Sequence, residues 1–256
     1  MLGKLMKYEF KATGRIMLPL YAALLGFSII NKIFIGTNMA EINMDFLGGI
    51  PAFITMFGYM ITMVAVFVGT LIITVQRFYK NLFGDEGYLM NTIPVKPSQN
   101  IVSKLIVSMI WIIISVFMAI ISVFIMAFEP EIFKEIIEAL KMIYPEIGSN
   151  IIVIIEFIIF GLVYLAYEIM VLYASLSIGQ LFKSRKILGA FAGFMIINIV
   201  QQAIVGIGVT TFVAIRNPIN IAPEHIFLYG IVISLLFFTA LFCITNYILK
   251  NKLNLE

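Results

Sequence analysis

Six long apolar blocks constrain this chain more than any other feature of its sequence. They cover approximately residues 16–36, 50–75, 105–128, 151–182, 187–215 and 226–249. At 1.5 Å per helical residue, each block can cross a hydrocarbon core of about 30 Å. Backbone polar groups in lipid must pair within helices or closed barrels, and these blocks lack the short alternating segments of barrel strands. The sequence therefore predicts an all-α polytopic membrane protein with six transmembrane helices, which form a single transmembrane domain over residues 1–256.

The lysines and arginines gather in alternate connections between the blocks, which predicts how the chain is oriented. One set lies in the N-terminal segment, the second and fourth connections and the C-terminal tail: Lys4, Lys7, Lys11, Arg15, Arg77, Lys80, Lys96, Lys104, Lys183, Arg185, Lys186, Lys250 and Lys252. The opposite set is small: Lys32, Lys134, Lys141 and Arg216. Both termini are therefore predicted to be cytoplasmic. The net charge of +3 is spread over short loops, so no nucleic-acid partner is expected.

Residues 1–15 are predicted to form a basic amphipathic helix at the inner membrane surface. At 100° per residue, the four basic side chains of this segment fall on one arc, opposite Leu2, Leu5, Met6 and Phe10. Two interpretations remain open, which are anchoring to anionic membrane lipid and docking to a cytoplasmic partner. Glu9 favours the partner, because it projects on the apolar side, where an unpaired carboxylate would be costly in lipid.

The cytoplasmic connection over 76–104 contains more glycine, proline, acidic and aromatic residues than a simple turn requires. Gly84 and Gly87 flank the acidic pair Asp85 and Glu86, and prolines 94 and 97 end a short run that can form a helical turn. This run would present three side chains to a groove in another protein: Tyr88, Leu89 and Met90. The alternative is a loop that lies on the membrane surface.

The extracytoplasmic connection over 129–150 combines acidic character with helical periodicity. Its apolar residues recur at helical spacing, while its charged residues occupy the other side. It is expected to form an amphipathic segment that caps the bundle, and a role as a substrate gate is the alternative.

A polar cluster is predicted near the middle of the membrane. Blocks four and five are joined by a short turn, so residues equally distant from that turn share one depth in an antiparallel hairpin. This places Glu168 at the level of Gln201 and Gln202, with Asn198 one helical turn away. The cluster either holds the helices together, with Glu168 protonated, or contributes to a substrate pathway.

Gly189 and Gly193 open the fifth block in a small-x-x-x-small pattern. This pattern permits close approach of another helix, either from the same chain or across a dimer.

Several chemistries have no support in the sequence. There is no G-x-x-x-x-G-K-[ST] phosphate-binding loop, so the chain is not expected to hydrolyse ATP by itself. The only histidine, His225, has no cysteine cluster near it, so no metal site or directly bound cofactor is expected. The chain is not predicted to be an enzyme.

Three stretches resemble permease subunits of the ABC-2 family of exporters, particularly small permeases of Gram-positive bacteria that serve antimicrobial-peptide export or immunity. They are KYEFKATGR at 7–15, GDEGYLM at 84–90 with PVKP at 94–97, and SIGQLF at 177–182 with KILG at 186–189. The resemblance implies a bacterial plasma membrane location and a core of two permeases, identical or sibling, with two cytoplasmic ATPase subunits that bind ATP and Mg²⁺. It also implies that the N-terminal helix with Glu9 and the 76–104 connection contact the ATPase, so that Asp85, Glu86 and Tyr88 to Met90 transmit its closure.

One departure from better-known family members concerns the outer segments. Those members often carry re-entrant helices between helices 5 and 6, whereas here the larger outer segment follows the third block. Two other functions also remain open: a membrane immunity or sensor protein that binds a toxin at 129–150 without transport, and an ion-coupled carrier that uses Glu168.

Overall fold

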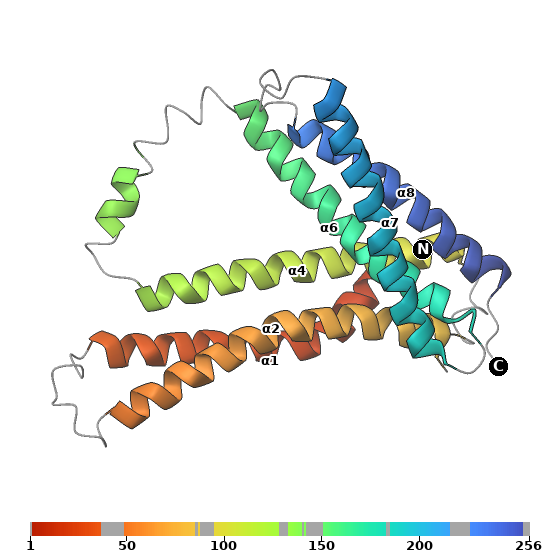
Figure 1. Ribbon diagram of the computed structural model, residues 1–256. Helices are drawn as coiled ribbons and strands as arrows, with labels where there is room; N and C mark the ends of the chain where they lie inside the picture. The colour runs from red at the N-terminus through yellow and green to blue at the C-terminus, as the bar shows by residue number, and fades with distance from the viewer. Residues whose placement is uncertain are drawn as a thin grey trace. The chain divides into compact units, whose positions relative to one another are not determined.

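The computed structural model consists of long helices (Figure 1). It describes residues 2–36, 49–84, 87, 95–127, 133–139, 141, 151–182, 185–215 and 226–252. The helices are α1 (Leu2–Gly36), α2 (Gly49–Phe83), α4 (Pro97–Ala127), α6 (Ile151–Gly179), α7 (Lys186–Ile215) and α8 (Ile226–Asn251). No strand occurs within these ranges, and all six helices are long and apolar enough to cross a membrane. The prediction of an all-α, six-helix polytopic membrane protein is confirmed.

Three helices extend beyond the apolar blocks from which they were predicted. Residues 2–15 of the basic segment continue without a break into the first block, so that both belong to α1, with Pro19 inside the helix. In the second connection, α2 continues to Phe83 and α4 begins at Pro97. Only residues 84–96 therefore lie between helices, where the sequence predicted a connection over 76–104.

The segment 129–150, which was predicted to be extracytoplasmic, is described only in part. Residues 133–139 are helical, in agreement with the periodicity of their sequence, and their side chains are exposed. The remainder of that segment, apart from Lys141, lies outside the described residues.

The chain divides into two compact units, and the division falls inside α2 and α4. Unit 1 comprises Met1–Thr74 and Ile106–Glu146, and unit 2 comprises Val75–Leu105 and Ile147–Glu256.

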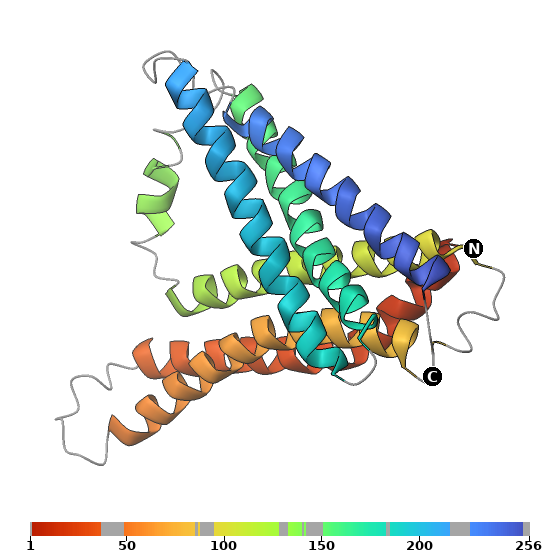
Figure 2. The same ribbon diagram turned by 45° about the vertical axis from the view of Figure 1, so that its right-hand side comes forward.

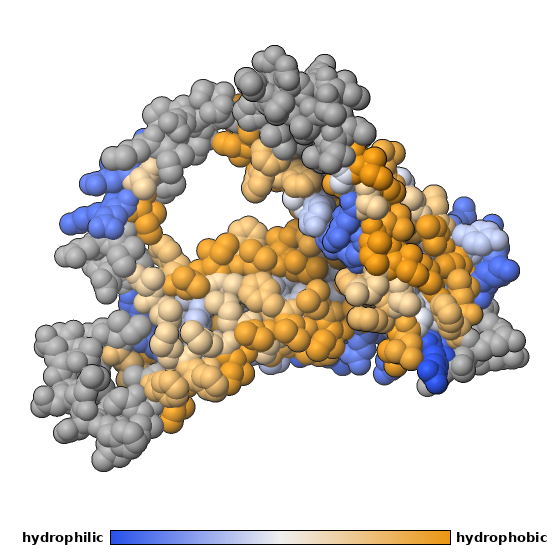
Figure 3. Space-filling model, viewed as in Figure 1, coloured by the Kyte–Doolittle hydropathy of each residue, from blue (hydrophilic) through white to orange (hydrophobic). Residues whose placement is uncertain are grey.

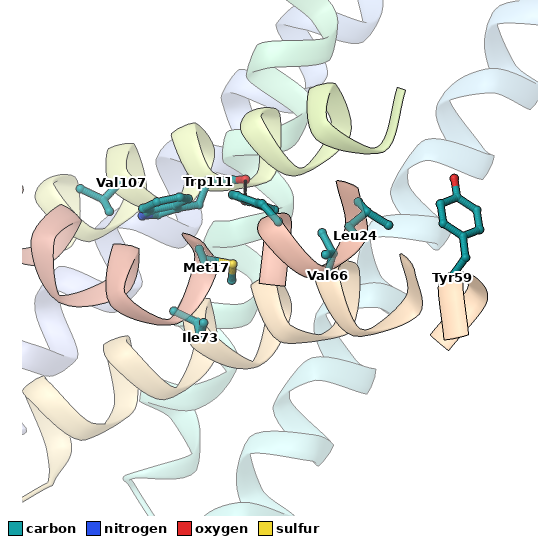
Figure 4. Packing of buried hydrophobic residues seen from close by; sticks show 8 residues of the cluster. Met17, Leu24, Tyr59, Val66, Ile73, Val107 and Trp111 are labelled. Carbon is teal, nitrogen blue, oxygen red and sulfur yellow. Dashed lines mark hydrogen bonds between the residues drawn. The ribbon is translucent and has the colours of Figure 1, made fainter. Parts of the chain in front are cut away.

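Unit 1 packs α1, α2 and most of α4 around a heptad seam. On α1, the seam positions alternate in steps of three and four residues: Gly14, Met17, Tyr21, Leu24, Ser28 and Asn31. All of them are buried. Figure 4 shows side chains of α1, α2 and α4 converging on one cluster, which includes Met17, Val66 and Trp111. Such spacing is typical of left-handed packing, in which side chains of one helix fill gaps in the next.

A series of buried side-chain hydrogen bonds crosses the same seam. The Tyr21 and Thr70 hydroxyls each lie 2.8 Å from Ser115 Oγ, so one serine joins α1, α2 and α4. The Tyr59 hydroxyl lies 3.0 Å from Ser122 Oγ. Because polar groups in lipid need a partner within the protein, these bonds fix which helix faces meet.

Unit 2 is organised around α6, which packs against both α7 and α8 (Figure 2). The turn between α6 and α7 is tight, because Gly179 lies directly against α7. A Cβ added at Gly179 would lie 2.6 Å from the Lys186 carbonyl oxygen and 2.7 Å from the Ala190 backbone nitrogen. The absence of a side chain at Gly179 is therefore what allows the two helices to meet at the turn.

This contact predicts that alanine substitution at two glycines of α6 will have different effects on the free energy of unfolding. Gly179→Ala should lower the free energy of unfolding by about 1–3 kcal/mol, because the new methyl group would overlap backbone atoms that cannot rotate away. The matched control is Gly161→Ala, since nothing lies within 4 Å of a Cβ there. That variant should be neutral or stabilising by up to about 1 kcal/mol, from reduced backbone freedom in the unfolded chain. Thermal unfolding in detergent tests the prediction, and equal midpoints for the two variants would contradict it.

Candidate functional site

The N-terminal part of α1 presents a solvent-exposed basic face. Lys4, Lys7, Lys11 and Arg15 are all exposed, whereas Leu2, Leu5 and Met6 on the other side are half-buried. Glu9 is also half-buried and belongs to the packed side. The segment therefore has the predicted amphipathic division at Leu2, Leu5 and Met6, whereas Phe10, predicted on the same apolar side, is 39% exposed.

Trp111 of α4 holds this basic segment in place. Its ring stacks on Phe10 with centroids 4.6 Å apart and planes 16° from parallel. Its indole Nε1–H donates a 2.6 Å hydrogen bond to Thr13 Oγ1, which in turn donates to the Glu9 carbonyl at 2.8 Å. A Cβ at Gly14 would lie 3.5 Å from the indole ring, so the helix backbone itself approaches Trp111. The basic face is thus carried by a helix that is fixed within unit 1.

The predicted coupling residues Asp85, Glu86, Tyr88, Leu89 and Met90 lie outside the described residues. The structure describes Gly84 before them and Gly87 between Glu86 and Tyr88. At the end of α2, the Gly84 N–H donates to the Tyr79 carbonyl at 3.2 Å and the Gly87 N–H donates to the Gly84 carbonyl at 2.8 Å.

The start of α4 has an ordinary physical explanation. The Lys96 carbonyl accepts the first helical hydrogen bond, from the Gln99 N–H at 2.9 Å. Pro97 then occupies the first helical position, where its missing N–H costs nothing.

The helix ends that flank this connection are packed into unit 2. Phe78 of α2 stacks on Tyr173 of α6, with centroids 3.8 Å apart and planes 7° from parallel, and both side chains are 0% exposed. Leu82 and Phe83 are buried in the same part of α2, and Phe83 meets Phe78 edge to face at 5.7 Å. The α4 end contributes buried Ile101. Residues 84–96 therefore connect the two helix ends, Val75–Phe83 of α2 and Pro97–Leu105 of α4, that belong to one compact unit with α6.

Glu168 lies within α6 and is half-buried. Its side chain is hydrogen-bonded to the hydroxyl of Tyr164, four residues earlier on the same helix. Contacts near the turn define the α6–α7 register, because Gly179 lies against Ala190 and Gly193 lies against Ile178. Continued along both helices, this register would set Glu168 opposite Gln201, and their common depth stays a prediction.

The four predicted polar residues are not bonded to one another in the described part of the chain. Glu168 bonds to Tyr164, and Asn198 Nδ2–H donates to the Phe194 carbonyl of its own helix at 2.8 Å. Gln201 is half-buried and Gln202 is exposed. Figure 3 shows a hydrophilic patch that interrupts the apolar surface over α6 and α7.

The two predicted packing glycines are both buried. A Cβ on Gly193 would lie 3.2 Å from the Ile178 side chain of α6, and one on Gly189 would overlap the ring of Phe182. Both glycines thus permit close packing within the chain.

The hydroxyl groups of Tyr21, Thr70 and Ser115, and those of Tyr59 and Ser122, form a hydroxyl seam in unit 1. This seam was not predicted from the sequence. Its signal was present in α4, where Ser108, Ser115 and Ser122 recur every seven residues within an otherwise apolar block. Serine and small residues at heptad spacing indicate a helix face that packs on other helices and not on lipid.

The residues that the structure describes contain no candidate metal-binding site. No group of three histidine, cysteine, aspartate or glutamate side chains lies close enough there to hold an ion, and His225 is outside those ranges. Comparison of the chain with protein-family models, with curated proteins and with solved structures finds no match.

Proposed function

We propose that this chain is the membrane-spanning permease subunit of an ATP-binding-cassette exporter in a bacterial plasma membrane. A separate cytoplasmic subunit would bind ATP and Mg²⁺ and hydrolyse the nucleotide, and a second permease, identical or sibling, would complete the pathway. Both termini would lie on the cytoplasmic side, together with residues 84–96. The exported compound would be a peptide or another amphipathic molecule.

The packing of Phe78 on Tyr173 is the observation that carries this proposal. An ATPase that pressed on residues 84–96 would move the ends of α2 and α4, and these ends are buried in one unit with α6. Because packed interiors shift as blocks and do not deform continuously, such a displacement would reach the membrane-spanning part of α6. The coupling residues in this connection would be Asp85, Glu86, Tyr88, Leu89 and Met90.

The basic face of α1 supports the same proposal. Four cations that are exposed on a fixed helix form a surface that an acidic protein partner can recognise, and Trp111 prevents this surface from swinging away. Glu9, on the packed side of the helix, would join the contact through the same segment.

Purification with the native partners tests the proposal. The tagged protein, extracted from its own membrane in mild detergent, is expected to bring down a stoichiometric ATPase subunit. Asp85→Ala/Glu86→Ala should then either lose that subunit or retain it with ATP hydrolysis uncoupled from transport. A matched control is Glu135→Ala/Glu138→Ala, which changes two exposed carboxylates of the outer helix at 133–139.

Recovery of the protein without an ATPase, under conditions that keep other membrane complexes intact, would contradict the exporter proposal. Flux driven by a pH gradient in liposomes that contain this chain alone would then support a carrier that uses Glu168.

A further inference from the structure

One side of α6 carries a stripe, inside the membrane-spanning region, in which two aromatic rings lie between two carboxylates. Its members recur every fourth residue and are therefore neighbours on the helix surface. They are Glu156, Phe160, Tyr164 and Glu168. The stripe covers about 18 Å at 1.5 Å per residue. None of the four side chains is fully buried, and Tyr164 is 42% exposed, so a ligand can reach them.

Aromatic rings of α8 extend the stripe to one side. Phe227 lies 6.1 Å from Phe160, and Phe237 lies 6.0 Å from Tyr167. Along α6, ring centroids are 5.8 Å apart for Phe160 and Tyr164, and 6.0 Å apart for Tyr164 and Tyr167. The carboxylates thus lie on a helix that also carries several aromatic rings, and the faces of such rings attract positive charge.

Two polar atoms beside this stripe lack a partner in the described part of the chain. The Tyr167 hydroxyl belongs to a side chain that is only 1% exposed, and no hydrogen-bond partner lies near it. Glu156 Oε2 is likewise buried without a partner. Because an unpaired polar atom in lipid is costly, a bound polar group would stabilise both positions. At Glu168, the Tyr164 hydroxyl already orients the carboxylate.

We propose that this stripe, centred on Glu168, binds lipophilic organic cations. The inference rests on the proposed function and names its substrate class: compounds that carry a positive group on an apolar body. The positive group would pair with Glu168 and lie against the exposed Tyr164 ring, while the apolar body would remain against the exposed apolar surface of α6. An anion of the same size and shape would be repelled by the carboxylates and would lose the attraction of the ring faces.

A pair of mirror-charged probes tests this site. The wild-type chain, reconstituted in lipid nanodiscs, is dialysed to equilibrium against tetraphenylphosphonium and, separately, against tetraphenylborate, with empty nanodiscs as the baseline. Protein-specific binding is expected for the cation only. Glu168→Gln should weaken that binding by about tenfold or more, because a neutral amide cannot offset the buried positive charge. Glu135→Gln is the matched control, since that exposed glutamate lies outside the stripe, and it should retain wild-type affinity.

A second variant separates a loss of binding from a loss of folding. Tyr164→Phe keeps the ring and the carboxylate but removes the hydroxyl that orients Glu168, so the affinity for tetraphenylphosphonium should fall about threefold while the elution profile stays unchanged. Equal binding of both probes, or unchanged cation affinity in Glu168→Gln, would overturn the proposal. Since the assay contains neither ATPase nor nucleotide, its failure would leave the ATPase partnership standing, and loss of that partnership would leave the cation site standing.

Discussion

Phe78→Ala is expected to lower the free energy of unfolding by about 3 kcal/mol, the low end of the cost of removing a buried phenylalanine. The Phe78 ring is 0% exposed, stacks on Tyr173 at 3.8 Å and meets Phe83 at 5.7 Å, so its loss leaves a cavity between α2 and α6. The surrounding helices are long and continuous and cannot collapse fully into this space. The same change should uncouple ATP hydrolysis from transport in the proposed exporter, since it cuts the contact through which residues 84–96 act on α6.

The two expected effects of Phe78→Ala are measured separately. Stability is followed by denaturant unfolding in detergent micelles, with Phe67→Ala as the control because Phe67 lies on the same helix and is 41% exposed. Coupling is followed as transport per ATP hydrolysed with the partner subunit present. Destabilisation no larger than that of Phe67→Ala would show that the stack does not hold α2 on α6. If the destabilised variant still transports as much per ATP hydrolysed as the wild type, the Phe78–Tyr173 contact does not couple hydrolysis to transport.

The membrane-spanning parts of the helices could be predicted because bilayer thickness and backbone pairing leave little freedom. An apolar run that is long enough to cross lipid has to be helical along its length, and Ile151, where α6 begins, is a predicted boundary that the structure reproduces. The helix ends beyond the apolar blocks are stabilised by burial against other helices. The stretches 76–83 and 97–104 are more polar than the blocks, and they remain helical because one face of each is buried in unit 2. Hydropathy alone carries no information about that burial.

The predicted polar site depends on the depth of its residues and on which side chains bond. Distance from the α6–α7 turn predicts one level for Glu168 and Gln201, because an antiparallel hairpin with a short turn would fix that relation. Which side chain bonds to Glu168 depends also on the rotation of each helix about its axis. Tyr164, four residues away on the same helix, lies within reach at any rotation, and the structure bonds Glu168 to it.

The hydroxyl seam of unit 1 was not predicted from the sequence for a different reason. Serine, threonine and tyrosine interrupt apolar blocks without altering their length, so a search for charged or amide side chains passes over them. Their significance lies in spacing, because Ser115 and Ser122 are one heptad apart and meet Tyr21 and Tyr59. A heptad count along α4 would have predicted the face that packs against α1 and α2.

Trp111→Ala is expected to release the basic segment of α1 and to lower the free energy of unfolding by about 3 kcal/mol. The variant removes the stack on Phe10, the hydrogen bond to Thr13 Oγ1 and the ring surface beside Gly14 together. These contacts are the ones that hold the first turns of α1 against α4. The readout is the rate at which trypsin removes an N-terminal tag at Lys7 or Lys11 in detergent-solubilised protein. We expect this rate to rise by about tenfold or more, since cleavage requires local opening of the helix.

Two comparisons separate a specific anchor from general loss of stability. Phe117→Ala alters a 60% exposed side chain on the same helix, and it should leave both the cleavage rate and the unfolding midpoint close to those of the wild type. Trp111→Phe keeps an aromatic ring opposite Phe10 but has no N–H to donate to Thr13, so its cleavage rate should lie between those of the wild type and Trp111→Ala. Cleavage that does not accelerate in Trp111→Ala would mean that α1 holds its basic face without the indole. In that case the N-terminal surface would depend on the membrane or on a partner for its position, and the intermediate behaviour of Trp111→Phe would also be absent.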